Sequence, residues 1–111
     1  PLNEVPAPIG RISLSVTSGS SREVTVPKLV SSILPDYPVS LRRRGAEGKI
    51  VLGLGLDRRG RISSLDVVRS DILELNASTI AAVQGWVFQP ARRGNESIDF
   101  SFRLTLRFYL E

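Results

Sequence analysis

The chain has 111 residues with a hydrophobic fraction of 41%, enough for one domain with a buried core. It contains no cysteine and no histidine, which excludes disulfides and thiol catalysis and argues against a zinc site and against histidine acid–base chemistry. The net charge is +4, and no apolar run approaches the roughly 20 residues that a membrane helix needs, so no membrane span is expected in this sequence.

The first segment, Pro1–Pro8, is rich in proline and predicts the end of an extended linker. Because the chain starts at Pro1 rather than at methionine, we interpret it as a piece of a longer protein. Residues 9–26 then alternate apolar and polar side chains, which predicts two short strands or a loose hairpin. We therefore expect residues 1–27 to be a linker end with extra strands, and residues 28–111 to be the main domain.

Proline residues divide the next segment, residues 28–44, into short elements. Residues 28–34 are expected to make one helical turn, and Pro35–Pro38 a rigid turn, because each proline disfavours a helical residue before it. Pro38 then opens a short helix through Arg44, and Gly45 is a natural stop.

Two strands and a tight turn follow. Residues 49–57 alternate leucine or isoleucine with small residues, and Asp57–Gly60 predicts a hairpin turn with glycine where a positive φ is needed. The return strand runs over residues 61–69. One slip in its alternation predicts a β-bulge near Ser63 and Ser64.

Helical spacing is found over residues 75–87, where Leu75, Thr79, Val83 and Trp86 share one face. Gly85 within this helix costs about 1 kcal/mol relative to alanine. The expected fold is α+β: a three-stranded antiparallel sheet packed against this helix, with the short N-terminal helix and the extra short strands.

The last segment, Ile98–Leu110, places an apolar side chain at every second position. This predicts one strand with an apolar and a wet face, about 40 Å long at roughly 3.3 Å per residue. No other segment is as long, so part of its backbone is expected to lie unpaired at an edge, available to another strand.

Other patterns predict no chemistry. Gly53-Leu54-Gly55 lies within a strand and lacks the context of a phosphate loop, and the acidic residues form no catalytic pair readable from spacing. The arginine clusters at 42–44, 58–61 and 92–93 suit solvated turns or an anionic partner. No nucleic-acid partner is expected, because no aromatic residues interleave them. We expect no enzyme, no metal and no cofactor.

Four ordered motifs resemble a known family, the TonB C-terminal domain. They are Pro35-Asp36-Tyr37-Pro38, Gly45-Ala46-Glu47-Gly48-Lys49-Ile50-Val51, Asp57-Arg58-Arg59-Gly60-Arg61-Ile62 and Trp86-Val87-Phe88-Gln89-Pro90-Ala91. The resemblance covers about residues 34–110. Two departures are Arg69–Ile72, where the family often has a Ser-Ser-Gly-like loop, and Val87, where it usually has a basic residue.

The resemblance implies a periplasmic domain, anchored to the inner membrane in the full-length protein and energised there by an ExbB/ExbD-type complex. Such domains bind the TonB-box segment of outer-membrane TonB-dependent transporters by strand addition to the last strand, and so drive active uptake, for example of siderophores or iron. The expected partner-binding residues are Asp99, Phe100, Ser101, Phe102, Arg103 and Leu104, together with Leu34, Pro35, Asp36, Tyr37 and Pro38.

Several alternatives stay open. The chain could be an envelope secretion or signalling module of the same fold, a basic domain that binds a cell-wall polymer such as peptidoglycan, or a homodimer. One further hypothesis concerns residues 9–26: they could pair with the edge of the last strand and occupy the docking site until a stronger partner displaces them.

Overall fold

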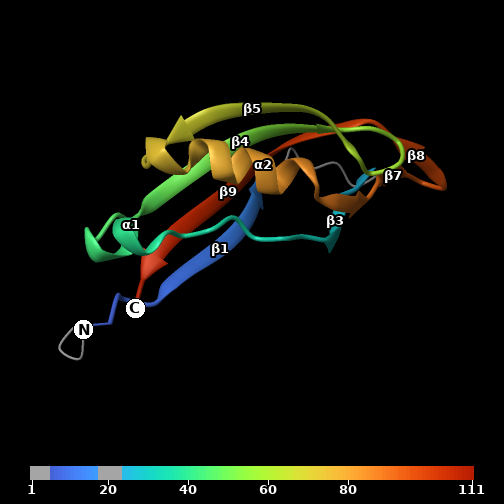
Figure 1. Cartoon of the computed structure of the whole chain (residues 1–111). Coiled ribbons are helices and arrows are strands. Elements are labelled where there is room, and N and C mark those ends of the chain that lie inside the picture. The colour runs from blue at the N-terminus through green and yellow to red at the C-terminus, as the bar shows by residue number, and fades with distance from the viewer. Residues whose placement is uncertain (1–5, 18–23) are drawn as a thin grey trace.

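The computed structural model describes residues 6–17 and 24–111, and its centre is a four-stranded antiparallel sheet in the order β1-β9-β4-β5 (Figure 1). The strands are β1 (Gly10–Thr17), β9 (Phe100–Leu110), β4 (Gly48–Leu56) and β5 (Ile62–Ser70). The α+β class and the three predicted strands are confirmed within two residues at each end. The expected count of three strands is wrong for this sheet, because β1 joins it beside β9.

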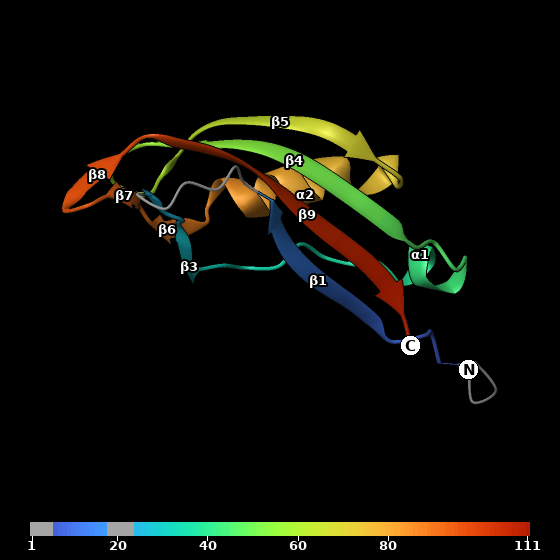
Figure 2. The ribbon, with the colours of Figure 1, turned by 180° about the vertical axis from the view of Figure 1, so that it is seen from behind.

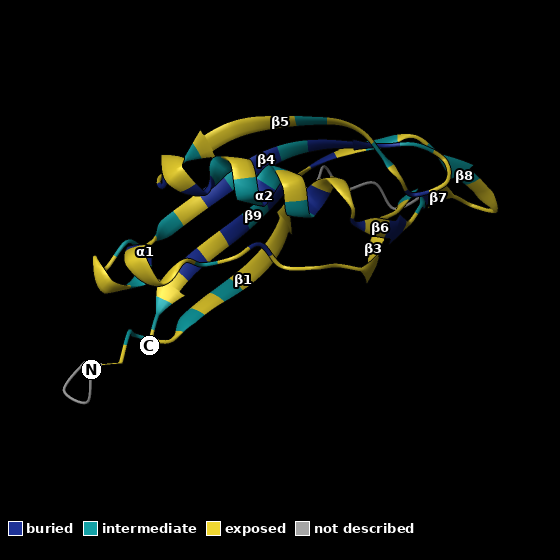
Figure 3. Ribbon diagram, in the orientation of Figure 1, coloured by how far each residue is buried: buried dark blue, intermediate teal, exposed yellow. Residues whose placement is uncertain are grey.

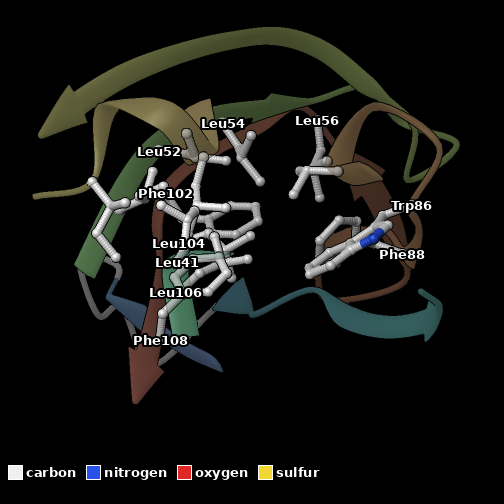
Figure 4. Packing of buried hydrophobic residues seen from close by; sticks show 14 residues of the cluster. Leu41, Leu52, Leu54, Leu56, Trp86, Phe88, Phe102, Leu104, Leu106 and Phe108 are labelled. Atoms are coloured by element: carbon white, nitrogen blue, oxygen red, sulfur yellow. The ribbon is translucent and has the colours of Figure 1, made fainter. Parts of the chain in front are cut away.

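The core lies on one face of the sheet, as the alternation in β9 predicts. Phe102, Leu104, Leu106 and Phe108 are buried, whereas the residues between them are exposed or half-buried (Figure 3). These side chains pack against the leucines of β4 and against Trp86 and Phe88 (Figure 4). Since a one-residue slip would turn every apolar side chain of β9 to solvent, the core fixes the register of the sheet.

Helices cover that same face. They are α1 (Val39–Arg43), a 3-10 turn (Leu73–Leu75) and α2 (Asn76–Gln84), and none of the helices of the described residues lies on the opposite face of the sheet (Figure 2). The predicted helix over 75–87 is too long, because α2 ends at Gln84 with Gly85 as its C-cap. Residues Val87–Gln89 form strand β6 instead. The short helix after Pro38 and its stop at Gly45, where φ is +73°, are confirmed.

Two small sheets lie at one end. Strands β2 (Val24–Thr25), β7 (Ala91–Arg93) and β8 (Glu96–Ile98) form one, and β3 (Lys28–Ser31) pairs with β6 to form the other. The helical turn predicted for residues 28–34 is therefore wrong, because pairing with β6 decides the conformation of this segment. Of the two alternatives for residues 9–26, two separate strands are confirmed and a hairpin is wrong, since β1 pairs with β9 and β2 with β7.

The β4–β5 turn forms as the sequence predicts. The Asp57 carboxylate accepts hydrogen bonds from the backbone N–H groups of Arg59 (2.8 Å) and Arg61 (3.0 Å), and Gly60 has φ +80°. The register shifts where Ser64 pairs with Gly55 but Ile62 with Leu56, which is the predicted bulge near Ser63.

Candidate functional site

The candidate site is the backbone edge of β9 that faces away from β4. β4 pairs with residues 100–108 of β9, and β1 pairs on the other side with residues 103–110 (Figure 2). The expected free edge is therefore wrong for residues 103–110. Among the described residues, no strand pairs with 100–102 on that side. The hypothesis that residues 9–26 pair with the edge of the last strand is confirmed for residues 10–17, whereas residues 24–25 pair with β7.

The predicted docking residues 99–104 lie on both sides of the last β1–β9 pair, Thr17 with Arg103. Arg103 pairs with Thr17 and Leu104 with Val16, whereas the residues before them lie beyond this ladder. Asp99 and Ser101 are exposed and Phe100 is half-buried, and Phe102 and Leu104 point into the core. This segment therefore offers a partner its backbone together with the exposed side chains of Asp99, Ser101 and Arg103.

Strand β1 pairs with β9 although few of its own side chains are buried. Leu14 and Val16 are 36% and 50% exposed, and Ile12 is the β1 residue that packs against the core cluster. Main-chain hydrogen bonds to β9 therefore supply most of the contact. This is how a strand adds to a sheet edge when the backbone supplies affinity and single side chains supply preference.

The start of β1 lies against Tyr37 and Arg42, and we call this contact the Tyr37–Arg42 clasp. Arg42 donates from Nη1 to the carbonyl oxygen of Pro8 (2.9 Å) and from Nε to the carbonyl oxygen of Tyr37 (3.0 Å). A Cβ at Gly10 would lie 2.5 Å from Cδ2 of Tyr37 and 2.8 Å from Cδ of Arg42. Glycine is therefore the residue that fits at this point of the strand.

Tyr37 belongs partly to the core. Its ring packs edge-on against Phe108 with centroids 5.4 Å apart, and its hydroxyl donates to the carbonyl oxygen of Ala46. Burial raises the pKa of Tyr37, and the Glu47 carboxylate raises it further, so the hydroxyl stays protonated at neutral pH. Of the other residues predicted here, Pro35 is buried, whereas Leu34, Asp36 and Pro38 are exposed.

The carboxylates with shifted pKa values have structural partners. Backbone N–H groups of Arg61 and Arg59 lower the pKa of Asp57, the N–H of Lys49 lowers that of Asp71, and the Arg44 side chain lowers that of Glu74. In residues 6–17 and 24–111 no group of three acidic side chains is placed to hold a metal ion. Within this described part, no helix has the length and apolarity to cross a membrane.

Sequence reasoning missed Arg42 and Gly10 as parts of this site. Arg42 was expected only as part of a basic cluster and of the short helix after Pro38, and no role was expected for Gly10. The hydrogen bond from Arg42 to Pro8 joins positions 34 residues apart, so no local sequence pattern predicts this contact.

A family model matches residues 34–110, and its description is "Gram-negative bacterial TonB protein C-terminal". Two curated relatives are similar. "Protein tonB2" of Pseudomonas aeruginosa is 36% identical over 66 residues, which cover 59% of this chain and 24% of that protein. "Protein TonB" of Vibrio cholerae is 31% identical over 90 residues, which cover 79% of this chain and 37% of that protein. The chain thus spans well under half the length of these relatives.

A solved structure has the same fold. It is the solution NMR structure of the Pseudomonas aeruginosa TonB CTD, with a TM-score of 0.55 and 22% sequence identity. The match covers 86% of this chain and 94% of that one.

Proposed function

The chain belongs to the family of Gram-negative bacterial TonB protein C-terminal domains, and from this membership we propose that it binds an extended segment of an outer-membrane transporter by strand addition to β9. In this proposal the domain is the distal part of a TonB-like energy transducer and catalyses no reaction itself. The guest strand is the TonB-box segment of a TonB-dependent transporter.

One observation carries the proposal: the edge of β9 already accepts an added antiparallel strand. Eight residues of β1 pair there in continuous register, although that strand has only one residue packed against the core. An edge that holds a strand by its backbone suits a guest of variable sequence. The predicted docking residues Asp99–Leu104 lie where the β1 ladder ends.

The arrangement of the whole protein is also a proposal. We place the domain in the periplasm, with an anchor in the inner membrane that precedes Pro1 in the longer protein. An ExbB/ExbD-type complex would supply proton-motive energy through that anchor. Pulling on the segment before β1 would then transmit force to the transporter strand bound at β9.

A second candidate is the binding of an anionic cell-wall polymer, favoured by the three arginine clusters. They are dispersed in the fold: Arg58, Arg59 and Arg61 flank the β4–β5 turn near β7, which carries Arg92 and Arg93, while α1 lies at the other end of the sheet (Figure 1). This separation favours strand addition over a single basic surface.

Titration of the isotope-labelled chain with a TonB-box peptide tests the proposal by NMR. We expect amide shifts that begin in residues 99–104 and extend along the edge of β9 that β1 covers. The control is the same peptide with proline at its centre, because proline removes a backbone donor and should abolish the shifts. A titration with an anionic cell-wall polymer that shifts the arginine clusters and weakens steeply with salt would instead support polymer binding. A transporter peptide that shifts no β9 amide would refute strand addition.

A further inference from the structure

β1 occupies the edge at which the proposed guest binds. Its eight residues, Gly10–Thr17, pair antiparallel with residues 103–110 of β9 (Figure 2). We propose that β1 is an internal pseudo-ligand, which defines the sequence of the guest and is displaced when the guest binds. This inference rests on strand addition at β9, and it names the preference and the regulation of that site.

The contacts of β1 define what a guest must carry. Gly10, opposite Leu110, leaves no room for a Cβ beside Tyr37 and Arg42. Ile12, opposite Phe108, is the side chain that turns inward to the core. The guest is therefore an extended antiparallel segment with glycine at the position that faces the clasp and a branched apolar residue two positions later.

The register of the sheet favours exchange at β9. The pairing of β4 with β5, the strand at the other edge of the sheet, contains two register shifts. Such β-bulges twist an edge strand and make it a poor template for another strand. The β1–β9 ladder contains none. An extended guest strand, whose side chains alternate as those of β1 do, can thus replace β1 one residue pair at a time while β9 stays in place.

Exchange has a starting point and an end point. It begins at residues 100–102, which no described strand covers on that side, and proceeds from the Thr17 pair toward the Gly10 pair. The last step separates Pro8 from Arg42. Because a strand rises about 3.3 Å per residue, release of β1 adds roughly 26 Å of extended chain to the N-terminal connection. Docking therefore lengthens the tether of the domain.

Occupation by β1 also sets the apparent affinity of the guest. The apparent Kd equals the intrinsic Kd divided by the fraction of molecules in which β1 is detached. A substitution that weakens β1 tenfold therefore tightens guest binding up to about tenfold, as long as β1 remains attached in most molecules.

The experiment uses the full chain and a synthetic peptide with the sequence of residues 6–17. In the Gly10→Val chain, the new side chain clashes with Tyr37 and Arg42, so β1 loosens while the edge of β9 is unchanged. We expect the peptide to bind this variant about tenfold more tightly than the unmodified chain, with faster hydrogen exchange of the β1 amides. Ser15→Val, at an exposed β1 position, is the matched control and should behave as the unmodified chain.

A second peptide, with valine in place of its glycine, should fail to bind the Gly10→Val chain. Equal binding of the two peptides would overturn the sequence preference, and β1 amides that stay protected while a peptide is bound at β9 would overturn displacement. Should Gly10→Val unfold the chain, Ile12→Ala takes its place, because it removes the β1 side chain that packs against the core and leaves the edge of β9 and the clasp unchanged. A TonB-box peptide that binds without releasing β1 refutes this inference alone. Exchange of the β1 peptide without any binding of the TonB-box peptide refutes the proposed partner instead.

Discussion

The indole Nε1 of Trp86 donates a hydrogen bond to the carbonyl oxygen of Ile33 at 2.9 Å. Trp86 is 2% exposed at the end of α2, whereas the Ile33 side chain is 79% exposed on the connector between β3 and α1. The bond therefore ties a connector with few buried side chains to the core. The same bond fixes the connector four residues before Tyr37, the residue that contacts the start of β1.

Trp86→Phe should lower the free energy of unfolding by about 2–3 kcal/mol. The change removes both the indole donor and part of a buried ring, and each loss costs about 1 kcal/mol or more. Urea unfolding followed by circular dichroism measures it, since Trp86 is the sole tryptophan of the chain. Val87→Ala, at the neighbouring exposed position, is the control and should change stability by less than about 1 kcal/mol. Equal losses in both variants would contradict a specific role for the indole.

Gly60→Ala should destabilise the fold far more than Gly94→Ala. Both glycines have positive φ, +80° and +62°, so each alanine substitution lowers the free energy of unfolding by about 1–2 kcal/mol because alanine disfavours the left-handed conformation. At Gly60 a Cβ would also lie 1.8 Å from the backbone oxygen of Phe88, while at Gly94 it would meet nothing within 4 Å. Thermal unfolding should therefore show a modest loss for Gly94→Ala and a severe loss for Gly60→Ala. Similar melting temperatures would refute the close approach of the β4–β5 turn to β6.

Arg42→Ala should accelerate hydrogen exchange of the β1 amides by about fivefold or more. It removes two hydrogen bonds from a charged donor, and one of them holds Pro8 at the start of β1. Such bonds contribute about 1.5 kcal/mol or more when well ordered. Arg44→Ala is the matched control, because the partner of Arg44 within the described residues is Glu74. Unchanged exchange in Arg42→Ala would show that backbone pairing alone holds β1.

Stability should fall as the pH drops below about 5. The folded state lowers the pKa values of Asp57, Asp71 and Glu74, so their contribution is complete above the unfolded pKa values of about 4 and is lost as pH falls through the folded values. Asp57→Asn should flatten this acid slope in urea unfolding series from pH 7 to pH 3. Asp99→Asn removes the same charge at an exposed position and serves as the control. Identical slopes in all three proteins would contradict the assignment.

At alkaline pH the stability of the fold should fall because Tyr37 loses its proton. Its pKa is raised in the folded state, so the contribution of the neutral hydroxyl is complete below about pH 10 and is lost as pH rises through the folded value. Since the chain has no histidine, stability should be nearly constant from about pH 6 to pH 9. Tyr37→Phe should reduce the alkaline loss, and a loss of the same size would assign it to other groups.

Local patterns in the sequence determined the inner strands, the tight turn and the two helices. Alternation in β4 and β9 selects the buried face, Gly45 and Gly60 provide positive φ at helix and hairpin ends, and the irregular spacing near Ser63 marks the bulge. These features depend on residues close together in the chain. They also carry the motifs that resemble the family.

The alternation in residues 9–26 suggested a pairing with the outer edge of β9, and only the tertiary structure decided that residues 10–17 take that edge. Residues 10–17 take this edge through main-chain pairing, and backbone pairing has almost no sequence signature. The contacts among Gly10, Tyr37 and Arg42 join segments far apart in the chain, as does the bond from Trp86 to Ile33. Such contacts form only when the sheet and its helices are assembled, so no periodicity within one segment encodes them.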